Sequence, residues 1–317
     1  MNEPFLKKYK PKFYKDFIID DEYKHLLNTL IRMDTLNILL IGNTSCGKSS
    51  LLDATIREYY NMEIIPRENV LYINNLQEQG ISYYRNEVKT FCRTPSVISG
   101  KKKFIVLDDI DTINEQSQQV FRNCIDKYSH NVNFIASCCN TQKVVESLQS
   151  RTTLIKLKPA TKEMLKKILS KIKSNEKIFI SEKAEDFILN VCNNSLRLLI
   201  NYMEKFNLLD EKITINKAKE ICTNISYFDL QKYTKEWFTN KSLKNSVKII
   251  YNIFEKGYSV MDILDSYFQF IKITSILNED EKYKTISIIC RYISLFHTLH
   301  ENEIELTFIT NDLINNI

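Results

Sequence analysis

The most constraining feature of this sequence is an eight-residue segment that starts at residue 42 and carries two glycines. It reads Gly42, Asn43, Thr44, Ser45, Cys46, Gly47, Lys48 and Ser49. This is the pattern G-x-x-x-x-G-K-[ST]. An apolar run at residues 37–41 precedes it and predicts a buried strand, and residues 50–56 have helical spacing. Strand, glycine loop and helix in this order are the context that a phosphate-binding loop requires.

The chemistry of such a loop follows from its backbone. Two glycines allow a tight turn that directs amide N–H groups at an anion, and the N-terminus of the following helix adds a favourable field. We expect Lys48 to reach the β- and γ-phosphates of a nucleotide and the Ser49 hydroxyl to bind Mg²⁺.

A phosphate loop also needs an acidic site, and residues 104–109 supply one. Residues 104–107 are apolar and predict a central strand, so Asp108 emerges at the strand's C-terminal end, where open α/β sheets bind ligands. Asp108 can hold Mg²⁺ through water, and Asp109 can orient or deprotonate the attacking water.

Strand and helix signals alternate through the first half of the chain. Further strands are predicted at 70–74, 132–138 and 153–157, and helices at 23–31, 81–92 and 115–128. This alternation implies a parallel sheet covered on both faces. After residue 159 strand signals nearly vanish, and helices are predicted at 161–173, 182–192, 196–206 and from about 229 onward, with breaks at 256–257 and near 278–280.

The overall composition limits the kinds of protein that this chain can be. A chain of 317 residues predicts two or three domains, and 44% apolar with 26% charged residues is typical of a soluble globular protein. A net charge of +5 permits nucleic acid as a partner without requiring it, and residues 101–103, all lysine, are expected to form a solvated turn. The 8 cysteines include no C-x-x-C pair and indicate an intracellular, reducing compartment. No run approaches the roughly 20 apolar residues of a membrane span.

Seven short segments, taken together, are similar in order and spacing to the motifs of one family. They lie at residues 8–11, 80–91, 108–111, 139–140, 149–152, 194–197 and 257–264. The chain resembles the AAA+ clamp-loader ATPases, most closely the small subunits of replication factor C, over nearly its whole length. The resemblance implies an α/β fold: an AAA+ parallel-sheet P-loop NTPase domain at 1–158, a helical lid domain at 159–226 and an all-α, oligomerising collar domain at 227–317.

The resemblance also implies an activity and partners. The expected function is that of an ATP-dependent clamp-loader small subunit in DNA replication, with ATP and Mg²⁺ as cofactors. The expected partners are other subunits of a hetero-pentamer, a sliding clamp and primer–template DNA, with no membrane. The expected location is intracellular: the nucleus for a cellular eukaryote, or a viral replication compartment for a virus.

Individual roles follow residue by residue from the matched motifs. Asn140 is expected to hydrogen-bond the γ-phosphate or the attacking water, and Arg151 to act as an arginine finger on a neighbouring subunit's ATP. Arg197 is expected to reach the nucleotide of its own subunit. Arg85 and Lys89, four residues apart on one helix face, are expected to contact the DNA backbone without reading sequence.

The chain departs from the family pattern at Asp109, where the family has Glu. The carboxylate is one methylene shorter, so nucleotide binding is better supported than fast hydrolysis. Two alternatives therefore stay open. One is a structural subunit that binds nucleotide, contributes Arg151 and hydrolyses little. The other is a different AAA+ replication protein, such as an initiator or helicase loader, although no β-hairpin signal follows the C-terminal helices.

Overall fold

The computed structural model describes residues 3–18, 21–73, 81–209, 211–223, 225–296 and 298–317, with the backbone alone for residues 81–85. The chain divides into two compact units. The first comprises Met1–Leu165 and Asn194–Asn201, and the second comprises Lys166–Asn193 and Tyr202–Ile317.

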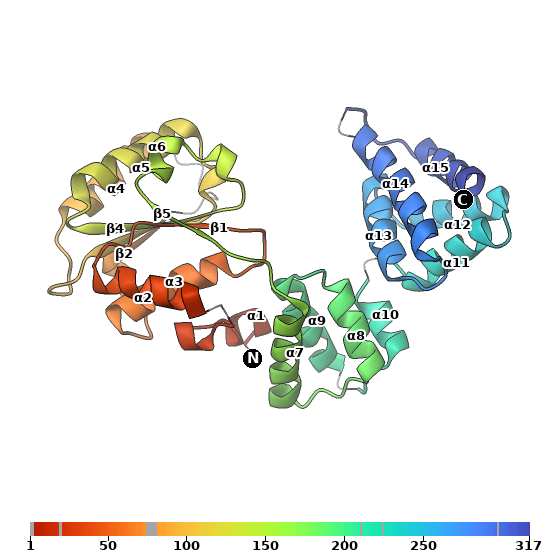
Figure 1. The fold of residues 1–317 in the computed structure, drawn as a ribbon, viewed down its shortest axis with the longest axis horizontal. Coiled ribbons are helices and arrows are strands. Elements are labelled where there is room, and N and C mark those ends of the chain that lie inside the picture. Colours follow the sequence, from red (N-terminus) through yellow and green to blue (C-terminus); the bar gives the residue numbers. More distant parts are fainter. Residues whose placement is uncertain (1–2, 19–20, 74–80, 210, 224, 297) are drawn as a thin grey trace. The chain divides into compact units, whose positions relative to one another are not determined.

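The first unit is built on a five-stranded parallel sheet, as the alternation of signals predicted (Figure 1). Its strands are β1 (Ile38–Ile41), β2 (Val70–Ile73), β3 (Lys103–Leu107), β4 (Val132–Cys138) and β5 (Thr153–Lys156). They lie in the order β2-β3-β4-β1-β5, and every pair is parallel. The predicted α/β fold class is confirmed.

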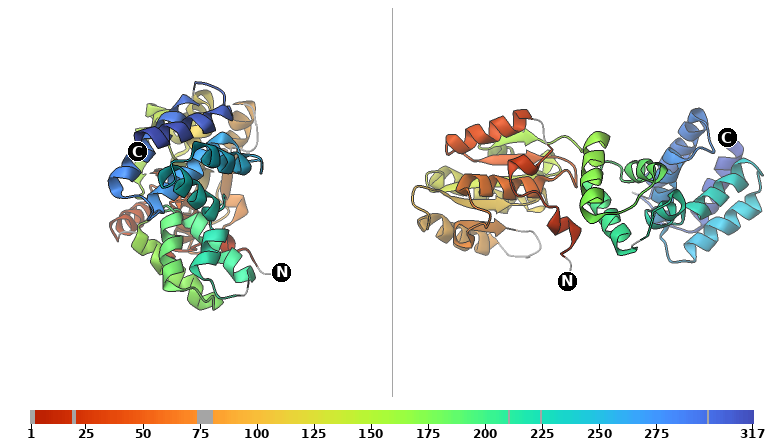
Figure 2. Two further views of the ribbon diagram at one scale, coloured as in Figure 1. Left: turned by 90° about the vertical axis from the view of Figure 1, so that its right-hand side faces the viewer. Right: turned by 90° about the horizontal axis from the view of Figure 1, so that it is seen from below.

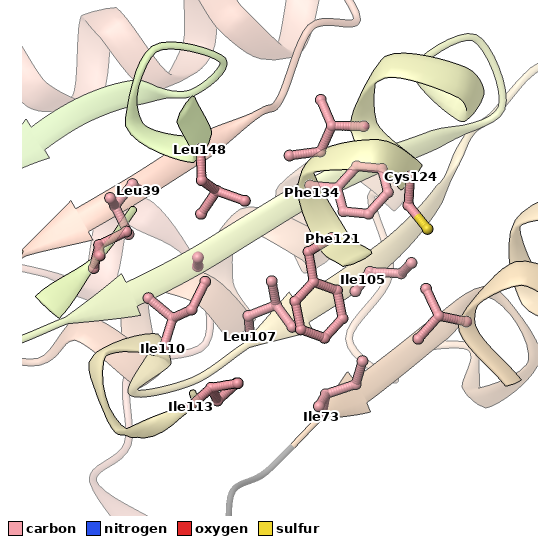
Figure 3. Close-up of a cluster of buried hydrophobic side chains, with 14 of the residues drawn as sticks. Leu39, Ile73, Ile105, Leu107, Ile110, Ile113, Phe121, Cys124, Phe134 and Leu148 are labelled. Atoms are coloured by element: carbon pink, nitrogen blue, oxygen red, sulfur yellow. The ribbon is translucent and has the colours of Figure 1, made fainter. Parts of the chain in front are cut away.

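Helices cover both faces of this sheet. On one face lie α4 (Ile81–Arg93), α5 (Glu115–Tyr128) and α6 (Glu146–Gln149), and on the other lie α2 (Asp21–Arg32) and α3 (Lys48–Tyr60) (Figure 1). Because strand side chains alternate between faces, Leu39 of β1 joins the core under α4 and α5, while Ile38 and Leu40 join the core under α2 and α3. Figure 3 shows Phe121 of α5 beside Leu107 of β3 in the first of these cores.

Parallel strands end at a common edge, and this places the site. Ile41 at the end of β1 pairs with Cys138 at the end of β4, and Leu107 at the end of β3 pairs with Ala136. The segments that follow β1, β3 and β4 therefore meet at the carboxyl edge of the sheet, the edge where such folds bind ligands.

The lysines at residues 101–103 do not form the solvated turn expected from the sequence. Lys103 is the first residue of β3 and is only 3% exposed. Its Nζ donates to the Thr94 hydroxyl (2.6 Å) and to the carbonyls of Phe91 (3.2 Å) and Thr94 (3.3 Å), at the end of α4. The Nζ of Lys101 donates to the carbonyl of Tyr59. The expectation failed because carbonyls left unpaired at helix ends are strong acceptors for a buried ammonium group.

The second unit is helical. Its helices are α7 (Lys162–Glu176), α8 (Glu182–Val191), α9 (Leu196–Leu209), α10 (Ile215–Ile221), α11 (Tyr227–Phe238), α12 (Leu243–Phe254), α13 (Val260–Ile273), α14 (Glu279–Leu295) and α15 (Ile304–Asn316) (Figure 2). The first turns of α7 and α9 belong to the first unit. The two predicted breaks are confirmed, because α13 and α14 each start at a capping box, Ser259 with Asp262 and Asn278 with Glu281. Short helices such as α10 and α1 (Phe5–Lys8) were not predicted.

The core of the last helices contains a polar network among large aromatic side chains. The Trp237 indole donates to the Tyr267 hydroxyl (2.7 Å), and the hydroxyls of Tyr233 and Thr310 are hydrogen-bonded (2.8 Å). All four residues are at most 1% exposed. Buried aromatic residues with satisfied polar groups contribute strongly to stability and fix how helices pack. No helix in the described part of the chain is long and apolar enough to cross a membrane.

Candidate nucleotide-binding site

The segment after β1 forms a tight loop in which two glycines occupy demanding positions. A side chain on Gly42 would place its Cβ 2.8 Å from the Cys46 Sγ and 3.2 Å from the Leu157 carbonyl oxygen, so only glycine fits there. Ser45 and Gly47 both adopt left-handed backbone, with φ of 63° and 93°. Alternation between right- and left-handed residues turns successive amide N–H groups into one concavity, which suits a phosphate.

Lys48 is the first residue of α3 and is only 6% exposed. Its Nζ folds over the loop and donates to the carbonyl oxygens of Gly42 (2.8 Å) and Asn43 (3.1 Å), and it lies 3.1 Å from the Cys139 Sγ. The ammonium group is thus held where the loop amides converge, at the N-terminus of a helix. Ser49 follows in the first turn and is exposed. Both placements fit the roles predicted from the motif.

Asp108 lies at the end of β3 and is held by the neighbouring strand. Its Oδ1 accepts a hydrogen bond from the Ser137 hydroxyl of β4 (2.5 Å), and the same hydroxyl accepts from the backbone N–H of Asp109 (3.0 Å). Ser137 is completely buried. Sequence reasoning missed this residue, although a hydroxyl near the end of a largely apolar strand is a signal that it binds something polar.

Asp109 lies in a cluster of charges. Desolvation, followed by the carboxylate of Asp108, raises the pKa of Asp109, and Asp111 acts in the same direction. The charges of Lys48 and Arg197 lower this pKa, which places both cations within electrostatic reach of the Asp109 carboxylate. A carboxylate with a raised pKa is a better proton acceptor than an ordinary one. The backbone of Asp109 is left-handed, with φ of 52°.

Asn140 is positioned by Asp111, a residue to which sequence reasoning gave no role. The Asp111 Oδ2 accepts from the backbone N–H groups of Cys139 (3.1 Å) and Asn140 (2.9 Å). The Asn140 Oδ1 accepts from the Gln142 N–H (2.9 Å), so its side-chain NH₂ is the group that can donate to a phosphate oxygen or to water. Asp111 thereby couples the turn after β3 to the turn after β4.

A second coupling residue was also missed. Gln118 of α5 is completely buried. Its Nε2 donates to the carbonyls of Ile113 and Lys143 (both 2.9 Å) and its Oε1 accepts from the Val145 N–H (2.9 Å). A buried amide with all these partners joins the segment after β3 to the segment that leads into α6. The available signal was a polar residue among the apolar positions of a predicted helix, since buried polar side chains need hydrogen-bond partners.

Arg151 lies at the other edge of the sheet. It directly precedes β5, whose first residue, Thr153, pairs with Ile38 at the start of β1. A strand of this length spans about 10 Å or more, so Arg151 cannot reach the loop of its own chain, which follows the end of β1. Its guanidinium instead binds Asp126 of α5 and the Ser147 carbonyl.

The two remaining predictions concern helices. Arg197 is exposed in the first turn of α9, beyond the left-handed residues Asn193 and Asn194. Lys89 is exposed on α4, next to the buried Val88. The side chain of Arg85 lies outside the described residues.

Comparison with known proteins agrees with this geometry. Residues 35–165 match the model of the AAA domain family. The first unit carries an AAA domain. The whole chain is similar to a protein described as a replication factor C small subunit in Acanthamoeba polyphaga mimivirus, with 27% identity over 90% of this chain and 88% of the other. A replication factor C small subunit of Methanococcus maripaludis is 25% identical over 91% of each chain. The similarity to replication factor C small subunits predicted from the motifs is confirmed.

The fold is shared more widely. The structure of a RuvB variant from Thermotoga maritima superposes with a TM-score of 0.56, at 15% identity, over 88% of this chain and 98% of that one. At that identity the match concerns the fold alone. It supports the assignment of an AAA+ P-loop fold followed by helices.

The residues of this AAA domain fit a nucleotide with Mg²⁺. No group of three or more His, Cys, Asp or Glu side chains within the described ranges is arranged to hold a metal by itself. Ser49 and Asp108 both carry side-chain oxygens near the carboxyl edge of the sheet. Mg²⁺ in nucleotide sites commonly takes one or two protein oxygens together with phosphates and water. These two oxygens would suit a Mg²⁺ ion that binds together with a nucleotide.

Proposed function

We propose that this protein is an ATPase subunit of a clamp loader, similar to the small subunits of replication factor C, that acts in DNA replication. The observation that carries the proposal is the convergence of Lys48, Asp108, Asp109 and Asn140 at the carboxyl edge of the AAA domain sheet. Similarity to replication factor C small subunits over about nine tenths of the chain supports the cellular role.

The proposed site works mainly by positioning and charge. The loop amides and Lys48 bind the β- and γ-phosphates of ATP, and Ser49 and Asp108 hold the Mg²⁺ that neutralises them. Asp109 accepts a proton from the attacking water, which its raised pKa favours. The Asn140 amide donates to the γ-phosphate or to that water, and Arg197 adds positive charge.

A neighbouring subunit supplies a further cation to the site. Because Arg151 lies at the amino edge of the sheet, it serves as an arginine finger for the ATP of an adjacent subunit in a hetero-pentamer. The other proposed partners are a sliding clamp, which ATP binding helps to open, and primer–template DNA, contacted by Arg85 and Lys89. We assign the complex to the nucleus or to a viral replication compartment, according to its source.

We propose that the chain has three domains, with boundaries after residues 158 and 226, and that each domain has its own part in clamp loading. An AAA domain binds the nucleotide, the helices of residues 159–226 form a lid that contributes Arg197, and the helices from residue 227 onward form a collar that holds the subunits together. The buried aromatic network of Trp237, Tyr267, Tyr233 and Thr310 makes the proposed collar a well-packed body.

The experiment is to co-express the chain with candidate partner subunits, purify the complex, and measure ATP hydrolysis with and without primer–template DNA and clamp. We expect hydrolysis that DNA and clamp together stimulate, and loading of the clamp onto DNA. A complex that hydrolyses ATP but neither opens nor loads any clamp would contradict the clamp-loader role while leaving the ATPase assignment intact.

A second candidate is a subunit of the same complex that binds ATP and hydrolyses it slowly. Asp109 favours it, because its carboxylate is one methylene shorter than the Glu of the family and a displacement of about 1 Å can cost about a hundredfold in rate. A complex in which only this subunit keeps its loop lysine separates the two. Turnover comparable to that of the intact complex excludes the second candidate, and ATP binding without turnover supports it.

A further inference from the structure

Arg151 makes two strong contacts with its own chain. Its Nε donates to the Asp126 Oδ1 at 2.6 Å, and its Nη1 donates to the Ser147 carbonyl at 2.7 Å. The hydrogen bond from Arg151 lowers the pKa of Asp126, so this carboxylate stays charged. The first contact comes from α5 and the second from α6, so two separate elements fix one guanidinium group.

These contacts leave one side of the guanidinium open. Arginine carries five N–H donors in a planar fork. The Nε and Nη1 sides are occupied, and among the described residues the Nη2 has no hydrogen-bond partner. The Arg151 side chain is 30% exposed, so part of it faces outward at the amino edge. A guanidinium held on two sides presents its third side in a fixed direction.

The contact with Asp126 contributes little to folding stability. The Asp126 side chain is 41% exposed, and exposed ion pairs typically contribute little. Asp126 also lies 3.8 Å from the Nε of Arg122, one turn earlier on α5. Asp126 thus lies between Arg122 and Arg151, and Arg151 is also bound to a backbone carbonyl. An exposed carboxylate in this position is suited to orient the Arg151 side chain rather than to stabilise the fold.

We propose that Asp126 is a positioning residue for the arginine finger. By holding the Nε of Arg151 while the Ser147 carbonyl holds Nη1, it directs Nη2 toward the γ-phosphate in the neighbouring subunit. The inference rests on the proposed trans role of Arg151 and adds a residue that acts only through Arg151. It also predicts that fixing the guanidinium before assembly reduces the conformational freedom lost when the neighbouring site is completed.

The test uses the assembled complex in which only the site completed by Arg151 can hydrolyse ATP. Asp126→Ala is expected to lower kcat at that site about tenfold, with KM for ATP and the melting temperature unchanged. Asp126→Glu, which keeps the acceptor, is expected to recover part of the rate. Glu115→Ala removes another exposed carboxylate from α5 and is expected to change nothing, so it is the matched control.

A double mutant separates positioning from other effects. In the Arg151→Ala background, adding Asp126→Ala is expected to have no further effect on kcat, because the residue acts through the missing side chain. An unchanged kcat for Asp126→Ala overturns the proposal. So does an increase, because Asp126 would then restrain the finger instead of directing it. If Arg151→Ala itself leaves the neighbouring site unaffected, it is the trans role that fails, and this result is distinguishable from the others.

Discussion

The two edges of the AAA domain sheet hold their charged residues in different ways. At the carboxyl edge, Lys48 is buried over its own loop and Asp108 is bound by the buried Ser137. At the amino edge, Arg151 is held by the partly exposed Asp126. At the carboxyl edge the charged groups are held by residues of the same domain, whereas the amino edge presents a cation outward. This difference motivates the proposal that the chain binds nucleotide by itself, whereas fast hydrolysis requires the assembly.

The largest effect is expected when the arginine at the amino edge is removed. Arg151→Ala should lower ATP hydrolysis in the adjacent subunit by about 10³-fold or more, the usual contribution of an arginine finger. ATP affinity of the mutated chain itself should not change, since Arg151 does not reach its own loop. Single-turnover hydrolysis in the complex measures the first quantity and nucleotide titration the second. Arg93→Ala, which removes the exposed arginine at the end of α4, is the control.

Removing the lysine at the carboxyl edge should have the converse effect: the chain itself should lose ATP affinity. Lys48→Ala removes charge-assisted hydrogen bonds to phosphate, so the Kd for ATP should rise about a hundredfold. The arginine that this chain contributes to its neighbour should remain functional. Titration of the free chain with a fluorescent ATP analogue measures the affinity. Lys143→Ala removes an exposed lysine from the turn after β4, and equal losses for the two variants would argue against a specific role of Lys48.

The carboxyl edge should also depend on Gln118, whose buried amide joins the segments that follow β3 and β4. Gln118→Leu preserves approximate volume and leaves the Val145 N–H and the carbonyls of Ile113 and Lys143 without partners. Burial of unpaired polar groups should lower the free energy of unfolding by about 2–4 kcal/mol. Gln119→Leu places the same change on an exposed neighbour and should have almost no effect. Urea unfolding of the three proteins measures the difference, and similar midpoints would contradict the structural role of Gln118.

A smaller effect concerns the protonation of Asp109. Because its pKa is raised above the usual 3.8, hydrolysis should begin to fall at a higher pH than an ordinary aspartate would give. The folded protein also holds this proton more tightly than the unfolded chain, so the contribution of Asp109 to stability is greatest at low pH and is lost as pH rises through the raised pKa. Asp109→Asn should lack this pH-dependent difference and should hydrolyse little. Rate and melting temperature measured against pH test both parts.

The smallest effect is expected at Lys89, which lies at neither edge. If it neutralises one DNA phosphate, Lys89→Ala should weaken binding equally for all sequences and reduce the slope of log affinity against log salt by about 0.9. Lys244→Ala, an exposed lysine of α12, is the control. Anisotropy titrations at several salt concentrations measure the slope, and a slope equal to that of the wild-type complex would show that Lys89 does not contact the backbone.

Much of the first unit was predictable, because its signals are local. The apolar runs before Gly42 and before Asp108 predicted β1 and β3, and the helix predicted at residues 115–128 is α5. The site residues that carry charge were also predictable, since the loop and the acidic segment are contiguous in sequence. Their roles stay predictions until they are tested.

What the sequence did not reveal are contacts between distant residues. Nothing near Ser137 indicates that it binds Asp108, and nothing near Lys103 indicates that it caps the end of α4. Gln118 and Asp111 were likewise missed, because their partners belong to other turns that the parallel sheet brings together. Local spacing predicts elements, whereas such contacts depend on the register of the strands and on which edge each turn occupies.

The positions of Gly42 and Arg151 at opposite edges of one sheet also constrain symmetry. A two-fold axis pairs one patch with the same patch of the partner, and a site and a cation at opposite edges do not lie in one patch. Copies or relatives of this chain that meet in this way must associate head to tail. If such a row does not close on itself, one end subunit holds a nucleotide that no arginine completes, and the other presents an arginine that has no nucleotide to meet.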